Sequence, residues 1–330
     1  MELLRQQTEK EQVKQILQQY GDDTLAYFHL QHNRKYFFSP SGKSFVSYKV
    51  LNKVAIVAGN PVGPEDEIRM LMQSFIHYAK SWQLKPFFVG LSDKYLALLN
   101  DLHMKILKIG EEAMLDLPSF DQDGLKKKVR RAVRHVEKLG VEIFFCNAQT
   151  LPKSFYADIY ALSKKWLANK GKKEKGFVMT LGRIPNQFDK DCQFAIAIQN
   201  TKIQGFLCFT PVYTKRMLSL DICRREDNAC NGLTEFLIIK SAEYFKERGV
   251  QKISLNFATF SGVTETHVSI KHKILYTTAQ ILKKMYKSDT LREFNEKFSP
   301  SWKNRYIAYT SKRNLPFYLL AILRAERFSA

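Results

Sequence analysis

The sequence is poor in cysteine and has no long apolar run. Five cysteines occur among 330 residues, and no two of them form a Cys-x-x-Cys spacing. Scattered thiols in apolar segments indicate a reducing compartment and argue against a disulfide framework or a structural zinc site. No run approaches the ~20 apolar residues that cross a bilayer, and the first residues lack the apolar core of a secretion signal. We therefore expect a soluble or peripheral protein.

Acidic residues are scarce relative to basic ones. Lys and Arg number 52 against 32 Asp and Glu, which gives a net charge of +20. The positive electrostatic field of such a surface concentrates polyanions, for example nucleic acid or anionic lipid headgroups. A basic surface that serves only general solubility is the plainer interpretation. Apolar residues make up 45% of the chain and aromatic residues 13%. This composition excludes a disordered chain and suffices for the cores of two domains.

The first half of the chain contains a β-β-α-β order. Runs of β-branched residues predict strands over residues 44–50 and 54–58, separated by a short turn. Apolar residues that recur every three or four positions predict a helix over 65–82. We expect the remaining elements of this half to be a polar leading helix over 12–20, a strand over 85–91, a second helix near 93–102 and two more short strands.

The second half repeats that order without evident sequence identity. Its predicted elements are strands over 193–199, 203–213, 217–222 and 250–257 and a helix over 233–248. This is the core order of the GCN5-related acetyltransferase fold. We therefore predict an α/β fold with mixed sheets, made of two such domains in tandem over residues 1–120 and 141–330 and joined by a basic helix over 121–140.

The segment 121–140 has the pattern of a basic amphipathic helix. Its apolar stripe, from Leu125 to Leu139, predicts one docked face. Seven cations crowd the remaining surface and repel one another unless an anion compensates them. We expect phosphate contacts here, while a solvated linker helix remains the alternative. The predicted contact residues are Lys126, Lys127, Arg130, Arg131 and Arg134.

The junction between the strand at 217–222 and the next helix is the expected reaction site. Asp221 and Arg224 lie at its start, and we predict that they orient the reacting groups, with a simple strand-end ion pair as the alternative. Arg225, Asn231 and Gly232 form a predicted anion-binding loop before the helix N-terminus. Acetyl-CoA enzymes usually have a turn with two glycines here, whereas this loop has one. The pattern favours a donor other than CoA.

Two further segments carry cations beside aromatic residues. Residues 164–175 combine Trp166 with six lysines and predict a flexible loop that follows a phosphate backbone, in which Lys170, Lys172 and Lys173 are candidate contacts. The apolar tail 315–323 is too short to span a bilayer, so it is either an interfacial segment or a final core helix. His267 and His272 have no metal-ligand spacing and predict no metal site.

Several motifs occur in an order that resembles one known family. They are Gly59-Asn-Pro-Val-Gly63, the basic helix, Thr180-Leu-Gly182, Asp221-x-x-Arg224 before Asn231-Gly232, and Lys297-Phe-x-Pro-x-Trp302-x-x-Arg305-Tyr306. Together they resemble the cytosolic catalytic part of the bacterial phosphatidylglycerol lysyltransferases, also called multiple peptide resistance factors. The chain departs from the family pattern at Asn60, Asn295 and Lys303, where the family has an acidic, a basic and an acidic residue, respectively.

This resemblance implies an enzyme that moves an aminoacyl group, such as lysyl or alanyl, from tRNA to the glycerol hydroxyl of phosphatidylglycerol or a related lipid. It implies aminoacyl-tRNA as co-substrate, no metal or other cofactor, and a location at the cytoplasmic face of the plasma membrane. Asp221 and Arg224 would bind substrate. Longer relatives carry membrane-embedded domains, and this chain is expected to be either free-standing or an excised part. The terminal motif would border the lipid through Lys297, Trp302, Arg305 and Tyr306.

Three other functions stay open at this level. The first is a CoA-dependent N-acyltransferase, which shares the predicted fold. The second is a paralogue that binds tRNA or membranes without catalysis, which the departures at Asn295 and Lys303 suggest. The third is transfer to an amine of a peptidoglycan precursor instead of a lipid hydroxyl.

Overall fold

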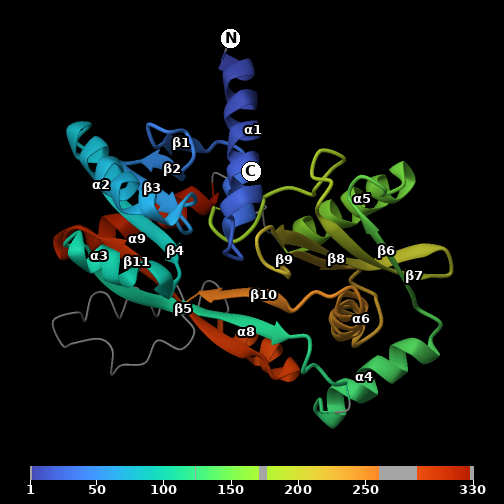
Figure 1. Ribbon diagram of the computed structural model, residues 1–330. Helices are drawn as coiled ribbons and strands as arrows, with labels where there is room; N and C mark the ends of the chain where they lie inside the picture. Colours follow the sequence, from blue (N-terminus) through green and yellow to red (C-terminus); the bar gives the residue numbers. More distant parts are fainter. Residues whose placement is uncertain (1, 123, 171–176, 260–287, 328–330) are drawn as a thin grey trace.

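In the part of the chain that the structure describes, 11 strands form one mixed sheet with helices on both of its faces (Figure 1). The computed structural model describes residues 2–122, 124–170, 177–259 and 288–327. The strand order is β1-β2-β3-β4-β11-β5-β10-β9-β8-β7-β6. The predicted histidines His267 and His272 lie outside the described residues, as do Lys172 and Lys173.

The first half follows the predicted order with several changes. The long helix α1 begins well before the predicted start, and a single long strand, β5, replaces the two short strands that the sequence suggested. The short helix predicted near 93–102 is present as a 3-10 turn followed by α3. The bounds are α1 Glu2–Tyr20, η1 Ala26–Leu30, β1 Lys35–Phe38, β2 Phe45–Leu51, β3 Val54–Ala58, α2 Glu65–Ser81, β4 Lys85–Leu91, η2 Asp93–Tyr95, α3 Leu96–Asp101 and β5 Lys105–Asp116.

The second half contains every element predicted for it and several more. Strand β6 and helix α5 were not predicted, and α5 shows that the prediction of a flexible loop over 164–175 was wrong for residues 164–169. The bounds are α4 Lys127–Lys138, β6 Glu142–Asn147, α5 Lys153–Asn169, β7 Gln193–Gln199, β8 Lys202–Val212, β9 Met217–Arg225, α6 Leu233–Glu247, β10 Lys252–Thr259, α8 Ser288–Asn295, η5 Glu296–Phe298, β11 Ser301–Tyr309, η6 Lys312–Asn314 and α9 Leu315–Arg327.

The two halves share the sheet. Strand β11, from the end of the chain, lies between β4 and β5, and β5 in turn pairs with β10. Among the described strands, the parallel neighbours are β3 with β4 and β9 with β10, and each pair is connected by one helix, α2 or α6. The repeated order therefore exists in space, while the division into domains at residues 120 and 141 stays a prediction.

The two parallel strand pairs differ in the length over which their strands remain paired. Strand β3 pairs with β4 along its whole length. Strand β9 pairs with β10 only from Met217 to Ser219, and beyond this point β9 continues beside β8 while β10 continues beside β5. An extra residue in β10 and the positive φ of Asn256 (76°) mark the divergence. The sheet thus opens between β9 and β10, next to Asp221.

Apolar clusters cover both faces of the sheet. One face carries η1, α5 and α9, and the other carries α2 and α3 over the first half and α4 and α6 over the second. Helix α9 is a core helix on one side, because Leu315, Tyr318, Ala321 and Ala325 are buried and Tyr318 stacks on Phe87 with ring centroids 4.7 Å apart. Of the two interpretations of the tail, packing against the core is the one observed. Across the part of the chain that is described, no helix has both the length and the apolar character needed to cross a bilayer.

Candidate functional site

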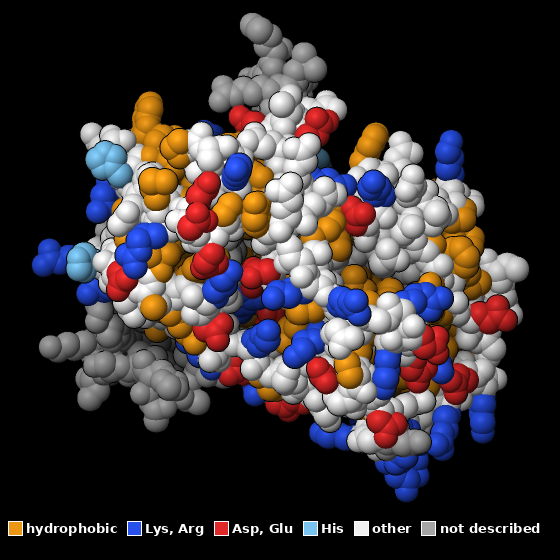
Figure 2. Space-filling model, in the orientation of Figure 1, with side chains coloured by type: hydrophobic (Ala, Val, Ile, Leu, Met, Phe, Trp, Pro, Cys, Tyr) orange, Lys and Arg blue, Asp and Glu red, His pale blue; other side chains and the backbone are white. Residues whose placement is uncertain are grey.

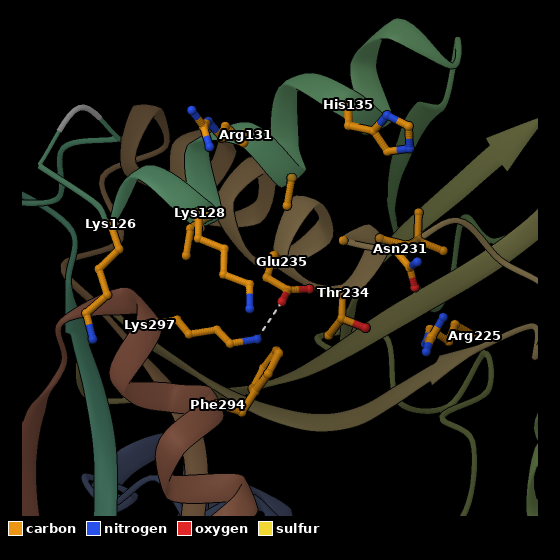
Figure 3. Close-up of a pocket in the computed structure, with 14 residues that line it drawn as sticks. Lys126, Lys128, Arg131, His135, Arg225, Asn231, Thr234, Glu235, Phe294 and Lys297 are labelled. Atoms are coloured by element: carbon orange, nitrogen blue, oxygen red, sulfur yellow. Dashed lines mark hydrogen bonds and ion pairs between the residues drawn. The ribbon is translucent and has the colours of Figure 1, made fainter.

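A basic cavity lies between α4 and the start of α6 (Figure 3). Its volume is about 570 Å³. Side chains of α4, of the loop before α6, of the first turn of α6 and of the α8–η5 region line it. These residues are Lys126, Lys128, Val129, Arg131, Ala132, His135, Arg225, Asn231, Gly232, Leu233, Thr234, Glu235, Phe294 and Lys297.

Close packing of α4 on α6 creates this cavity. The apolar stripe of α4 is buried at Val129, Val133 and Val136, as its periodicity predicted. Gly232 has a φ of 92°, and a Cβ there would lie 2.8 Å from the Cβ of Ala132. Only glycine therefore allows both the left-handed turn and this approach of α4 to the N-terminus of α6. The docked stripe leaves the cationic side of α4 along the rim, and Lys and Arg side chains gather over α4 in the space-filling view (Figure 2).

The lining of the cavity is strongly positive. Five cationic side chains face one carboxylate, so the net charge of the lining is four positive units. Two of the cations belong to α4, and the others are Lys126 just before α4, Arg225 and Lys297. The Nζ of Lys297 donates to Oε1 of Glu235 at 2.7 Å, and Lys128 reaches toward the same turn from the other side (Figure 3). Helix α6 adds the positive end of its dipole and the N–H groups of its first turn. This combination suits a phosphate group.

The cavity brings together residues that the sequence placed in three separate groups. Lys126 and Arg131 of the basic helix and Arg225, Asn231 and Gly232 of the anion-binding loop line it, as does Lys297 of the terminal motif. Lys128 also lines it although it was not among the predicted contacts, because helical periodicity alone does not show which side of α4 faces α6. Lys127, Arg130 and Arg134 are on α4 outside the lining, and Lys170 follows the end of α5 at the surface.

On the opposite face of the sheet, Asp221 lies at the opening between β9 and β10. Its Oδ1 accepts a hydrogen bond from the backbone N–H of Leu181 at 3.2 Å. The same segment accepts a hydrogen bond at the Met179 carbonyl from Nδ2 of Asn256, at 3.1 Å. The motif Thr180-Leu-Gly182 is therefore held between β9 and β10 at the point where these strands separate. Sequence order alone did not indicate this contact.

A β-bulge at Asp221 determines which way the Asp-x-x-Arg pair faces. Cys208 and Phe209 of β8 pair with Ile222 and Leu220 of β9, so Asp221 is the extra residue. In a regular strand, positions three apart face opposite sides of the sheet. The bulge shifts the alternation of β9 side chains between the two faces of the sheet by one residue. As a result, Ile222 packs into the apolar cluster on the face that carries α5. Asp221 and Arg224 consequently share that face, while Arg225 lines the cavity on the other.

Arg224 packs on an aromatic ring of α5. Its guanidinium lies 4.2 Å from the ring centroid of Trp166, and its Nη1 donates to the Cys223 carbonyl at 3.0 Å. The sequence pattern predicted that Trp166 lies in a flexible loop that follows a phosphate backbone. In the structure Trp166 belongs to a helix and stacks on Arg224, so it restricts where that cation can point.

The prediction that Arg305 contacts a lipid is wrong, because its side chain is enclosed and its donors are used. It is 2% exposed. Its Nε and Nη2 donate to Glu112 at 3.0 and 2.6 Å, and its Nη1 donates to Asp23 at 2.8 Å and to the Gly90 carbonyl at 3.2 Å. Burial alone raises the pKa of Glu112, but the charge of Arg305 and the hydroxyls of Ser254 and Thr24 outweigh it and hold that pKa below its usual value.

The other members of the terminal motif do not lie on one common surface. The Trp302 side chain packs against the core under α8, where the Arg292 guanidinium lies 4.3 Å from its ring centroid. Tyr306 packs at the edge of the core between the sheet and α3. Lys297 alone of the four lines the cavity. Among the described residues, no group of three or more His, Cys, Asp or Glu is arranged to hold a metal ion.

Comparison with known proteins gives consistent matches over most of the chain. The family described as "Phosphatidylglycerol lysyltransferase, C-terminal" matches residues 14–309. A Gordonia bronchialis protein named "Lysylphosphatidylglycerol biosynthesis bifunctional protein LysX" is 27% identical over 93% of this chain and 28% of its own length. A Staphylococcus epidermidis protein named "Phosphatidylglycerol lysyltransferase" is 24% identical over 94% of this chain and 37% of its own length. The chain thus spans about a third of these relatives.

Solved structures match over nearly the whole chain. L-PGS from Bacillus licheniformis superposes with a TM-score of 0.86 at 25% identity and covers 97% of both chains. The C-terminal domain of a lysylphosphatidylglycerol synthetase from Agrobacterium fabrum gives 0.86 at 22% identity and covers 98% of both. FemX shares the fold more distantly, with a TM-score of 0.58 at 9% identity. The predicted mixed α/β fold and the predicted family are confirmed, and the chain belongs to the phosphatidylglycerol lysyltransferase C-terminal family.

Proposed function

We propose that this chain transfers an aminoacyl group from tRNA to the glycerol hydroxyl of phosphatidylglycerol at the cytoplasmic surface of the membrane. The observation that carries the proposal is the opening between β9 and β10 beside Asp221, with the basic cavity at the end of β9 on the other side of the sheet. A transferase that acts on two large substrates needs two openings through which they reach one reaction centre. Family membership supports the same activity.

The basic cavity is the proposed site for phosphates of the tRNA acceptor end. Its net positive lining and the N-terminus of α6 attract a polyanion. The loop from Arg225 to Gly232 has one glycine, so it lacks the second glycine with which acetyl-CoA enzymes wrap a pyrophosphate. Isothermal titration with charged tRNA and with acetyl-CoA separates the two donors. Tighter binding of acetyl-CoA would favour the N-acyltransferase alternative.

The proposed reaction is an ester exchange. The lipid hydroxyl oxygen forms a bond to the aminoacyl carbonyl carbon, the bond from that carbon to the tRNA ribose oxygen breaks, and the hydroxyl proton ends on the ribose oxygen. No oxidation occurs. Because the donor ester is already activated, alignment and stabilisation of the developing oxyanion supply most of the catalysis. In this proposal, Asp221 accepts a hydrogen bond from the hydroxyl or the ammonium, and Arg224 binds negative charge.

Lipid analysis tests this function directly. The chain is expressed in a bacterium that lacks aminoacylated phosphatidylglycerol, and extracted lipids are analysed by mass spectrometry. The expected result is a new aminoacyl ester of phosphatidylglycerol, whose mass identifies the amino acid. Arg224→Ala should abolish it without changing the unfolding midpoint. Arg216→Ala, an exposed arginine just before β9, is the matched control. A modified peptidoglycan precursor in place of the lipid would contradict the proposed acceptor.

Salt dependence tests the assignment of the cavity to tRNA. Replacing Lys126, Lys128 and Arg131 with Ala should weaken tRNA binding and reduce the slope of log K against log salt by roughly 2 to 3, since each phosphate contact contributes about 0.7 to 0.9. A triple variant at the exposed Lys53, Lys80 and Lys215 removes the same charge elsewhere. Equal slopes for the two variants would show that only the overall charge matters. Tight tRNA binding without any aminoacyl lipid would favour the inactive paralogue.

A further inference from the structure

Asn256 lies in β10 at the point where this strand leaves β9. The last paired residues of the two strands are Ser219 and Ser254, and Asn256 follows two positions later in the bulge of β10. Its φ is 76°, in the left-handed region that few residues other than glycine adopt, with asparagine among the exceptions. A residue in this conformation persists only where the surrounding structure holds it. The contacts on both sides of Asn256 show what holds it here.

On one side, the backbone of Asn256 is attached to the buried network that joins the two halves of the sheet. Its N–H donates to Oγ of Ser254 at 3.1 Å, and the Ser254 hydroxyl donates to Oε1 of Glu112 in β5. Ser254 and Glu112 are fully buried, and Arg305 donates twice to the other carboxylate oxygen of Glu112. The bulge is therefore anchored to β5, on the side away from β9.

On the other side, the amide of Asn256 reaches the segment that contacts Asp221. Its Nδ2 donates to the Met179 carbonyl at 3.1 Å, and its Oδ1 accepts from the Phe257 N–H at 2.7 Å. A carbonyl partner and an N–H partner together determine which end of the amide is the nitrogen. Aspartate has no donor for the carbonyl and glycine has neither group, so an asparagine suits both contacts and the left-handed backbone.

A three-residue bridge, residues 179–181, connects Asn256 to the carboxylate of Asp221. At its far end the Leu181 N–H donates to Oδ1 of Asp221 at 3.2 Å, and the Leu181 side chain is fully buried in the apolar cluster that includes α5 residues. Asp221 is the extra residue of the β9 bulge, and β10 no longer pairs with β9 at this position. The bridge thus spans the gap between the two strands, with Asn256 at one end and Asp221 at the other.

We propose that Asn256 is a positioning residue, which holds the carboxylate of Asp221 toward the reacting groups through the bridge of residues 179–181. This rests on the proposed function. Alignment supplies much of the rate of an ester exchange, and a shift of about 1 Å in an aligned group can cost about 100-fold. Loss of the Asn256 amide should therefore slow the chemical step more than it weakens substrate binding.

Steady-state kinetics of the full chain, with charged tRNA and phosphatidylglycerol vesicles, test this role. Asn256→Asp keeps a left-handed backbone and the contact to Phe257 but places an oxygen opposite the Met179 carbonyl. It should lower kcat by roughly 10- to 100-fold. Asn256→Gly fits the same φ without either side-chain contact and should lower kcat similarly. The KM for aminoacyl-tRNA should stay within about twofold, because the basic cavity lies on the other face of the sheet.

The turn between β2 and β3 offers a matched control. Asn52 is exposed and also has a left-handed backbone, with a φ of 49°. Asn52→Asp and Asn52→Gly repeat the two chemical changes away from the opening and should leave kcat unchanged. An unchanged kcat for Asn256→Asp would overturn the proposal. A rise in KM at unchanged kcat would show that Asn256 acts in substrate binding, which also contradicts a positioning role.

Hydrogen exchange of the Leu181 amide tests the same link without turnover. In Asn256→Asp the bridge is released at one end, so the Leu181 N–H should exchange roughly tenfold faster than in wild type. Amides of β7, a strand paired on both sides, should keep their wild-type rates. Unchanged exchange at Leu181, or equally faster exchange in β7, would overturn the proposal. If wild type forms no aminoacyl lipid, the proposed function fails, and exchange at Leu181 alone decides whether Asn256 holds the bridge.

Discussion

The two parallel strand pairs of the sheet share one design and differ at one place, the entrance to the connecting helix. In the first half, β3 and β4 stay paired and the loop before α2 is closed by internal contacts. In the second half, β9 and β10 separate and the loop before α6 borders a basic cavity. We call these the closed junction (residues 59–67) and the open junction (residues 221–235). The same order of elements thus forms a filled, structural junction in one half and, in our proposal, a binding junction in the other.

The closed junction is filled by side chains of the segments that surround it. Asn60 is 4% exposed, and its Nδ2 donates to Oγ of Ser92 at 2.8 Å while its Oδ1 accepts from the Ser92 N–H at 2.9 Å. Asn60 Nδ2 also lies 3.3 Å from Asp23, the partner of Arg305. The Gly-Asn-Pro-Val-Gly motif therefore belongs to the buried network that joins the halves, and Asn60 makes structural contacts.

The two helix N-termini also differ in charge. The first turn of α2 contains Glu65, Asp66 and Glu67, and the Glu67 carboxylate accepts from the hydroxyls of Ser39, Ser41 and Ser44. These carboxylates already occupy the positive end of the α2 dipole and repel a further anion. The first turn of α6 has one carboxylate, paired with Lys297. Charge as well as shape is therefore consistent with the proposed anion binding in the second half.

The largest expected effect concerns the network behind the closed junction. Arg305→Met leaves Glu112 and Asp23 without their cation, and removing one partner of a buried ion pair costs about 3–5 kcal/mol. Urea unfolding followed by circular dichroism measures this loss. Arg216→Met, at an exposed arginine just before β9, is the control and should change stability by less than about 0.5 kcal/mol. A loss below about 1 kcal/mol for Arg305→Met would contradict the structural role.

Acid should lower the unfolding free energy of the protein through protonation of His29. Burial and the charge of Arg34 lower its folded pKa to about 3, against about 6.5 in the unfolded chain, so the unfolded state takes up the proton first. Stability is complete above pH 6.5 and falls as the pH drops toward 3, by about 2 kcal/mol at pH 5. Unfolding free energies of wild type and His29→Gln across this range measure it. An equal slope in both proteins would exclude His29 as the source.

The sequence predicted the regular parts of this molecule well. Helix α2, strands β3, β4 and β7 and the start of α6 lie at or within a residue or two of their predicted bounds, because apolar periodicity and turn residues determine them locally. Helix α5 was missed because its lysines resemble a solvated loop, although Ile159 and Leu162 face the core. Placement of β11 between β4 and β5 depends on contacts far apart in sequence, which no local pattern records.

The candidate site was predicted in its parts but not in its arrangement. Asp221 and Arg224 share one face only because of a bulge, and a bulge depends on pairing with β8. Arg305 was assigned to lipid because it belongs to the terminal motif, which by family resemblance borders the lipid site. Its burial became visible only when β11 was placed between β4 and β5, where Asp23 and Glu112 surround it.

Substitution of one asparagine in each junction compares the two junctions directly. The expected stability effect is of intermediate size. Asn60→Ala leaves the Ser92 N–H and hydroxyl without their partner and should cost about 1–3 kcal/mol. Asn231→Ala, at the exposed entrance of α6, should change stability by less than about 0.5 kcal/mol. Chemical unfolding of both variants gives the two values, and tRNA titration should show the reverse ranking. Equal stability losses would remove the distinction between a closed and an open junction.

The smallest effect on stability is expected at the cavity itself. Lys297 and Glu235 form a partly exposed pair, which is worth about 1 kcal/mol or less because solvent screens it. Lys297→Met should therefore barely move the unfolding midpoint, yet it exposes the Glu235 carboxylate at the N-terminus of α6, where it repels phosphate. Weaker tRNA binding follows, and Glu235→Gln in the same background should restore part of it. A double variant no better than Lys297→Met would indicate that Lys297 contacts the RNA itself and does not act by neutralising Glu235.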